Sequence, residues 1–165
     1  MREISPEQID KNAFKLIGED WMLITAQKGD KTNTMTASWG GLGVFCNKNV
    51  AFTFIRPQRY TKEFVDEADT FSISVLPDKY REQLAYLGKV SGRDENKIEK
   101  AGLTTVFDGE TPYFEEAQLV IICKKMCSTD LEKESFIQPD LCEKFFPKND
   151  YHTLYISEIT KVLSK

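Results

Sequence analysis

Short segments in which apolar and polar residues alternate are the feature that most restricts the fold of this chain. In "TFSISVL" (70–76), Phe71, Ile73 and Val75 share one face of a predicted strand, and two serines share the other. Similar segments recur between turn residues, whereas helical spacing is confined to short stretches without the strand–helix–strand repeat of a parallel sheet. The sequence therefore predicts a mainly β protein, in which a mostly antiparallel sheet closes into a barrel with a few peripheral helices.

The expected elements are short and follow one another closely. Predicted strands occupy 21–26, 34–39, 44–46, 50–55, 70–76, 117–127 and 151–163. Predicted helices occupy 5–16, 62–68, 78–88 and a short stretch within 91–102, with Thr61 capping the second and Ser91 or Asp94 capping the last before Gly102 ends it. "GGLG" (40–43) is expected to be flexible, and a polar, aromatic-rich excursion (128–150) separates the last two strands.

Length, charge and cysteine content narrow the class of protein. A chain of 165 residues without repeats or linkers is expected to form one domain, 1–165. Its net charge of −4 argues against nucleic acid as the main partner. The first residues are too polar for a signal peptide, and the most apolar run, "LVIIC" (119–123), is too short to cross a bilayer. We therefore expect a cytoplasmic protein with no membrane partner, whose cysteines stay reduced.

Conventional catalytic motifs do not account for a function. Cys123 and Cys127 would share a strand face, but no second pair or histidine cluster completes a zinc site, so no metal is expected. The chain has no G-x-S-x-G elbow, and "GGLG" matches neither a P-loop nor a dinucleotide-binding glycine motif. The one histidine, His152, is open to either a structural or a catalytic interpretation.

A hydroxyl-rich segment, "NTMTASWGG" (33–41), contains no acid, base or thiol. On a strand, Thr34, Thr36 and Ser38 would share one face and the apolar residues between them the other. Half-buried strand packing produces this pattern, and so does a strand that offers hydroxyls and backbone amides to a polar ligand. The segment by itself leaves both alternatives open.

Two basic loops favour the ligand-binding alternative. "RPQRYT" (56–61) places two arginines before a predicted helix, where free backbone amides and a guanidinium bind a single phosphate. In "SGRDENK" (91–97), glycine permits close backbone approach while arginine and lysine add positive charge. Together with the hydroxyl-rich strand, these loops indicate a phosphorylated, planar or sugar-like ligand on which Trp39 and Tyr60 would stack.

The same segments, in the same order, resemble the flavin reductase-like FMN-binding split-barrel family, including its flavoredoxin branch. The matching segments are "WMLITA", "NTMTASWGGLG", "RPQRYTKEF", "FSISVL", "SGRDENK" and "YHTLYISEI", and they span nearly the whole chain. The resemblance implies a six-stranded Greek-key split barrel, a homodimer, and FMN bound in a cleft at or near the dimer interface.

The resemblance also implies which residues hold the FMN. The strand 33–39 would run beside the flavin, and the loops 56–61 and 91–97 would hold its phosphate or line it. His152 would lie on the nicotinamide side, although relatives often have Gly-Asp-His where this chain has "NDYH". The expected cofactor-binding residues are Asn33, Thr34, Met35, Thr36, Ala37, Ser38, Trp39, Arg56, Arg59, Tyr60, Thr61, Ser91, Gly92, Arg93 and Lys97.

The first functional hypothesis is therefore an NAD(P)H-dependent flavin reductase, in which hydride passes from NADH or NADPH to the flavin. Because a flavin carries its own redox chemistry, such a protein needs few catalytic side chains, in agreement with the missing acid–base motifs. One alternative is a flavoredoxin-like FMN electron carrier that a redox partner protein reduces. The other is a barrel that has lost its ligand and only dimerises.

Overall fold

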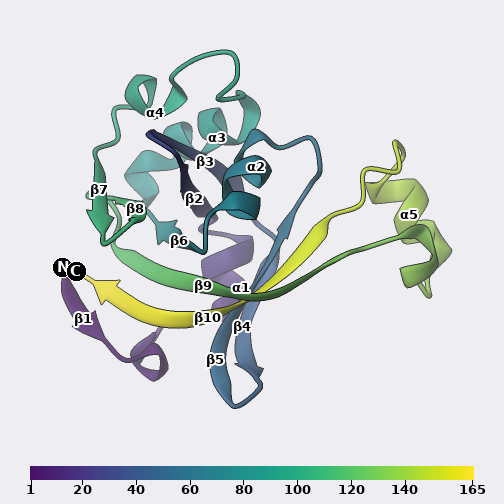
Figure 1. The fold of residues 1–165 in the computed structure, drawn as a ribbon, viewed down its shortest axis with the longest axis horizontal. Helices are drawn as coiled ribbons and strands as arrows, with labels where there is room; N and C mark the ends of the chain where they lie inside the picture. The colour runs from purple at the N-terminus through teal and green to yellow at the C-terminus, as the bar shows by residue number, and fades with distance from the viewer.

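One curved antiparallel sheet with short helices around it makes up the computed structural model, which describes residues 1–165 (Figure 1). The sheet has eight strands in the order β3-β2-β6-β9-β10-β5-β4, with β1 paired to β10. They are β1 Arg2–Ile4, β2 Met22–Lys28, β3 Lys31–Ala37, β4 Gly40–Phe45, β5 Lys48–Ile55, β6 Thr70–Val75, β9 Leu119–Asp130 and β10 Thr153–Ser164. A separate hairpin consists of β7 Thr105–Asp108 and β8 Thr111–Phe114.

The two edge strands of the sheet, β3 and β4, follow each other directly in the chain. Only Ser38 and Trp39 lie between them. Neighbouring strands are about 4.8 Å apart, so two residues cannot cross a flat sheet of this width, and the sheet must curl until its edges meet. No hydrogen-bond ladder pairs β3 with β4, so the barrel stays split along this line. The predicted mainly β split-barrel fold is confirmed, with eight strands in the main sheet rather than six.

The helices are short and lie around the sheet (Figure 1). They are α1 Ala13–Gly18, α2 Tyr60–Glu67, α3 Arg81–Lys89, α4 Lys97–Lys100 and α5 Pro139–Phe145. Three 3₁₀ turns accompany them, η1 Pro6–Gln8, η2 Asp78–Tyr80 and η3 Lys133–Ser135. None of these helices has the length and apolar character needed to span a bilayer.

Two apolar cores hold the barrel and its helices together. On β2, Ile24 belongs to the larger core, to which α1 and α2 also contribute, whereas its neighbour Leu23 belongs to a second core with Leu84 and Leu87 of α3. Successive side chains of a strand point to opposite faces, so both faces of β2 are buried. This double burial fixes β3, the neighbour of β2, between the barrel and α3.

Several local predictions differ from the structure. The "GGLG" segment is part of β4, and a Cβ at Gly40 would lie 2.6 Å from the carbonyl oxygen of Phe52, so the glycine permits close strand approach. The predicted helix 5–16 divides into η1 and α1, because Asn12 caps the second by accepting from two backbone amides. Neither Ser91 nor Asp94 caps α4, since the Asn96 side chain accepts from the amide of Glu99.

A projecting segment, residues 131–150, separates β9 from β10 and is called the arm. Figure 1 shows α5 and its neighbouring turns well away from the other helices. The base of the arm is closed by pairing of Asp130 with Thr153 and by the Leu131 amide, which donates to the His152 carbonyl at 2.9 Å. No arm residue belongs to either core, so the arm is attached to a body that is stabilised elsewhere.

A bulge in β9 corrects the expected arrangement of two cysteines. Ile156 pairs with Cys127 while the next residue, Ser157, pairs with Lys125, so one residue of β9 is extra at this point. An extra residue interrupts the two-residue alternation of a strand. Cys123 is therefore buried whereas Cys127 is exposed, and the two thiols do not share a face.

Candidate functional site

A cleft of about 250 Å³ lies where the split of the barrel meets the beginning of β10 and is called the polar cleft. Five consecutive residues of β3 and the β3–β4 connection line it, together with residues from β5, the loop after β5, and the residue before β10. The lining residues are Met35, Thr36, Ala37, Ser38, Trp39, Phe54, Arg56, Arg59 and His152.

Strand pairing explains why Arg56 and His152 are neighbours although the sequence separates them widely. Ile55, the last residue of β5, pairs with Thr153, the first residue of β10. Arg56 directly follows the one and His152 directly precedes the other, so both side chains enter the cleft from the same end of the strand pair. A turn in which the Arg59 amide donates to the Arg56 carbonyl at 3.1 Å then returns Arg59 to the cleft.

The predicted row of three ligand-facing hydroxyls on β3 is not formed. Thr34 is fully buried, and its hydroxyl lies 2.8 Å from that of Thr25 and donates to the Ile24 carbonyl at 3.1 Å. The Thr36 hydroxyl donates to the Leu84 carbonyl of α3 at 2.6 Å, so it joins the strand to the helix from the wall of the cleft. Ser38 alone of the row is exposed. The strand is covered on both faces, which alternation alone does not reveal.

The two arginines of the cleft differ in their hydrogen bonding. Arg56 forms an ion pair with Asp150 at 2.5 Å and donates to the Phe145 carbonyl at 3.0 Å, both in the arm. Arg59 donates through Nη1 to the Gly88 carbonyl at 2.9 Å, whereas its Nη2 is buried without a partner. Burial, and secondarily the charge of Arg56, lower the pKa of Arg59, but a guanidinium stays protonated at neutral pH. Nη2 of Arg59 is thus a charged donor available to an anion.

His152 is buried, with 7% of its surface exposed, and its Nδ1 has no hydrogen-bond partner. Its ring lies 5.0 Å from that of Trp39 and 5.5 Å from that of Phe146, measured between centroids. Burial and the nearby charge of Arg56 lower the pKa of His152 to about 4, with Asp150 acting in the opposite direction. The imidazole is therefore neutral at pH 7, and it offers a hydrogen-bonding atom without a charge.

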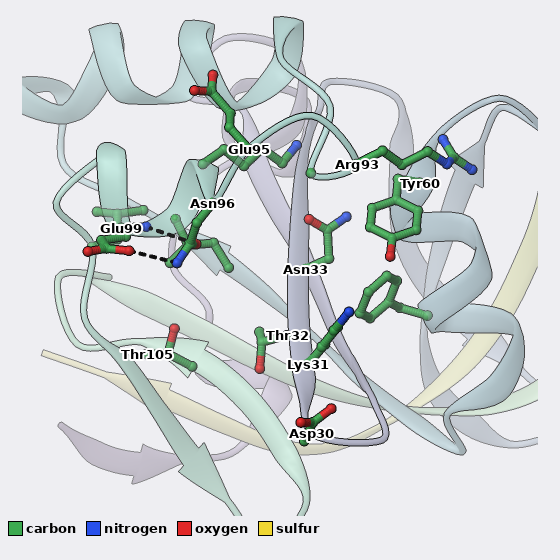
Figure 2. A pocket seen from close by; sticks show the side chains of 15 residues that line it. Asp30, Lys31, Thr32, Asn33, Tyr60, Arg93, Glu95, Asn96, Glu99 and Thr105 are labelled. Atoms are coloured by element: carbon green, nitrogen blue, oxygen red, sulfur yellow. Dashed lines mark hydrogen bonds between the residues drawn. The ribbon is translucent and has the colours of Figure 1, made fainter.

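A larger hollow of about 710 Å³, the charged pocket, lies on the other side of the beginning of α2 (Figure 2). Five of the predicted site residues line it, namely Asn33, Tyr60, Gly92, Arg93 and Lys97. Figure 2 shows Asn33 on β3 with Tyr60 and Arg93 beside it. The predicted residues therefore divide between two hollows, because Arg59 lines one and the next residue, Tyr60, lines the other.

Two of the three cations that line the charged pocket, Lys97 and Arg93, are already engaged, and the third is Lys31. Lys97 is buried and donates to the carbonyls of Leu87 and Val90 at 2.9 Å each. Burial, with a smaller contribution from the charge of Arg59, lowers the pKa of Lys97 to about 8. Arg93 forms an ion pair with Glu63 and covers the ring of Tyr60, with its guanidinium carbon 4.6 Å from the ring centroid. Both cations stabilise the loop that follows α3.

Hydrogen bonds and close contacts within the protein account for the other predicted residues around the charged pocket. Asn33 donates through Nδ2 to the Thr61 hydroxyl at 2.9 Å, so Thr61 links α2 to β3 instead of capping the helix, which begins at Tyr60 after the N-cap Arg59. A Cβ at Gly92 would lie 2.2 Å from Asn33 Oδ1, which explains the glycine at this point. The Ser91 hydroxyl accepts from the amide of Arg93 at 3.2 Å and lines neither hollow.

One side chain that lines the polar cleft and one that holds a lining residue have no counterpart among the predicted residues. Phe54 of β5 lines the cleft, and Asp150 fixes Arg56 and also accepts from the Gln58 side chain at 2.7 Å. Asp150 lies 94 positions after Arg56. No local sequence pattern indicates such a pair, and the sequence places Phe54 only in the predicted strand 50–55.

A split barrel with a cleft at its split, in which a buried arginine nitrogen has no partner, defines the class of this protein, and sequence comparison identifies the family within that class. The chain belongs to the flavin reductase-like domain family, whose model matches residues 15–164. The family resemblance of the sequence is therefore confirmed. A search of curated protein sequences found no match.

Solved structures share the fold at low sequence identity. An FMN-binding domain of a flavin reductases-like enzyme from Shewanella baltica has 18% identity and a TM-score of 0.71, covering 98% of this chain and 75% of that chain. Flavoredoxin of Desulfovibrio vulgaris has 22% identity and a TM-score of 0.70, covering 98% and 77%. The NADH:FAD oxidoreductase SgcE6 of Streptomyces globisporus, in complex with NAD and FAD fragments, has 14% identity and a TM-score of 0.65, covering 88% and 74%.

Proposed function

We propose that this protein binds FMN and acts as an NAD(P)H-dependent flavin reductase. The observation that carries the proposal is the buried, unpartnered Nη2 of Arg59 in a cleft lined by a strand end, in a member of the flavin reductase-like family. A buried charged donor without a partner costs free energy, so an anionic group of a ligand would complete it. The phosphate of FMN is such a group.

The residues of the polar cleft fit a phosphorylated flavin. Arg59 would hold the phosphate, while Ser38 and the backbone from Thr36 to Ser38 would offer polar groups to the ring edge and the ribityl chain. When bound, FMN supplies the redox chemistry by taking a hydride from a nicotinamide. The protein's own part is to bind and orient, with Arg56 fixed by Asp150 at the cleft wall and Trp39 beside the neutral His152.

An anaerobic titration tests the reductase proposal. The purified protein is expected to be yellow, and its flavin absorbance should bleach when NADH or NADPH is added without oxygen. Both nucleotides should be titrated in parallel, with sodium dithionite as the positive control for reducible flavin. A colourless protein that does not take up added FMN would contradict the proposal and would favour a barrel that has lost its ligand.

A second candidate is an FMN electron carrier that a partner protein reduces. The projecting arm favours it, because exposed apolar side chains on it, including the 97% exposed Ile137 and Phe145, offer a contact surface away from the barrel. The similarity to flavoredoxin is consistent with this candidate. It predicts a yellow protein that dithionite bleaches but neither nucleotide does, so the same titration separates the two.

A further inference from the structure

An apolar cavity of about 330 Å³ adjoins the polar cleft and shares three of its walls, Trp39, Phe54 and His152. We call it the aromatic pocket. The arm supplies the remaining walls, which are Leu131, Phe136, Leu141, Phe145 and Phe146. The flavin-binding proposal uses none of these arm residues, so the pocket has no role in the function described so far.

The side chains around the aromatic pocket meet edge to face. The rings of Trp39 and Phe145 have centroids 5.7 Å apart and planes at 84°, and those of Trp39 and Phe146 are 6.3 Å apart at 71°. Such walls present ring faces and ring edges to the interior, which is the environment that a further aromatic ring prefers. The pocket therefore favours a planar ring over a flexible aliphatic chain.

His152 is the one polar side chain of the pocket, because every other lining residue is apolar. It is more than nine-tenths buried, and its Nδ1 has no partner. The lowered pKa of His152 keeps the imidazole neutral at pH 7. An imidazole in this state can donate to or accept from one polar group of a ligand, but it provides no charge to pair with an ion.

Charged ligands are disfavoured in the aromatic pocket. No Asp, Glu, Lys or Arg lines it. Two cations lie against its walls without lining it. Lys144 Nζ is 5.1 Å from the ring centroid of Phe145, and the guanidinium carbon of Arg56, whose charge is paired with Asp150, is 5.2 Å from that of Phe146. An ionised carboxylate would lose its hydration without gaining a partner.

We propose that the aromatic pocket binds a small neutral aromatic molecule that carries one hydrogen-bonding group, such as an aromatic ketone, with the ring among the arm aromatics and the polar group on His152. Binding itself needs only the described walls. That the molecule would lie beside the flavin rests on the proposed function, because the two hollows share Trp39, Phe54 and His152.

Three small probes of similar size test this proposal on the full chain. Acetophenone has a neutral ring with one acceptor, ethylbenzene lacks the acceptor, and benzoate carries a charge. Ligand-detected saturation-transfer NMR, followed by titration, should give acetophenone an affinity at least tenfold higher than benzoate and several-fold higher than ethylbenzene. Equal binding of acetophenone and benzoate, or no binding of acetophenone, would overturn the proposal.

Matched variants of the arm locate the binding. Leu141→Arg places a charge in the pocket wall and should reduce acetophenone binding at least tenfold, whereas Ile137→Arg makes the same change at a 97% exposed position outside the pocket and should leave it unchanged. His152→Phe keeps a ring but removes the hydrogen-bonding atom, so acetophenone should lose its advantage over ethylbenzene. An equal effect of the two arginine variants would contradict the assigned site.

Two further outcomes distinguish this inference from the proposed function. If the protein binds acetophenone but not FMN, the aromatic-pocket proposal is supported and the flavoprotein proposal is contradicted. If it binds FMN but not acetophenone, the flavoprotein proposal is supported and the aromatic-pocket proposal is contradicted. Binding that appears only on dilution to a monomer would mean that a second copy of the chain covers the pocket, and it would overturn the proposal.

Discussion

Arg59 and Arg56 are three residues apart and line one cleft, but only Arg59 has a guanidinium nitrogen left without a partner. Arg56 is held by two groups of the arm. A hydrogen bond between charged groups contributes roughly 1.5–3 kcal/mol, provided that one group is not already paired. The hydrogen bonding therefore favours Arg59 over Arg56 as the phosphate ligand. The sequence does not distinguish the two arginines, because both lie in the same loop.

Arg59→Ala should weaken FMN binding by about 1.5–3 kcal/mol, or roughly tenfold to a hundredfold, through the lost phosphate contact. Riboflavin lacks the phosphate, so its affinity should hardly change. The FMN affinity of Arg59→Lys, which keeps the charge, should lie between those of the wild type and Arg59→Ala. Fluorescence titration of all three proteins with FMN and with riboflavin measures these affinities. Equal losses for FMN and riboflavin would show that Arg59 does not contact the phosphate.

His152 makes stability depend on pH in a defined direction. Its pKa is lowered from 6.5 to about 4 in the folded protein, so between these values the unfolded chain binds a proton that the folded chain does not. The contribution of the neutral ring is thus fully present above pH 6.5 and is lost as the pH falls toward 4. His152→Phe removes the titration while keeping a ring in the same packing.

The free energy of unfolding, measured in urea at pH 7 and pH 5, checks this prediction. Between pH 7 and pH 5, the free energy of unfolding of the wild type should fall by about 2 kcal/mol more than that of His152→Phe, since each pKa unit corresponds to about 1.4 kcal/mol. Carboxylates titrate in both proteins and cancel in the comparison. A difference that does not change with pH would mean that the buried imidazole is not held neutral.

At the scale of elements, the alternating strands were predictable and the glycine-rich strand was not. Polar and apolar residues alternate from Thr70 to Val75, and β6 occupies these same residues. In β4 the glycines have no side chain with which to alternate, so their role in close packing against Phe52 appears only in three dimensions. Likewise the sequence does not single out Asn96 as the cap of α4, because Ser91 and Asp94 are equally good capping residues.

The arm is expected to be dispensable for folding. Neither core contains an arm residue, and Leu131 and His152 already meet at its base. Replacing residues 132–151 by Asn-Gly, which favours a tight type I′ hairpin turn, should therefore preserve the β-sheet circular dichroism and a single cooperative thermal transition. It should abolish acetophenone binding, because four of the eight residues that line the aromatic pocket, Phe136, Leu141, Phe145 and Phe146, are removed. A non-cooperative transition would show that the arm helps to hold the barrel.

For the whole molecule, a homodimer remains a proposal. Large apolar side chains are exposed at the tip of the β4–β5 hairpin, where Val44 is 71% and Phe45 is 40% accessible, and β4 is a sheet edge. Exposed apolar groups beside an edge strand are typical of surfaces that associate. Sedimentation equilibrium should therefore give twice the chain mass of 19.0 kDa.

A matched pair of variants tests which surface associates. Val44→Lys should shift the equilibrium toward the monomer, whereas Phe14→Lys, on α1 at 87% exposure, serves as the control for adding a charge at an exposed apolar position. Dissociation by the α1 variant alone would place the interface elsewhere. A monomer in the unmodified protein would contradict the dimer outright.

The overall class was predictable, whereas the assembly of the site was not. Period-two alternation and the order of motifs indicate a split barrel of this family without any structure. They do not show that the pairing of β5 with β10 brings His152 beside Arg56, or that the predicted residues divide between two hollows at the beginning of α2. Both depend on pairing between segments that are distant in the sequence, for which the sequence has no local signal.

The two-residue connection between β3 and β4 also has a consequence for the order of folding events. The hairpins on either side of it, β2–β3 and β4–β5, are local and need little chain to close. In the sheet, the two hairpins are joined through hydrogen bonds only when β9 and β10, from the last third of the chain, pair between β6 and β5. Such distant pairings form slowly. After dilution from urea, strand signal should therefore return before FMN can be captured, because the cleft does not exist until the last strands arrive.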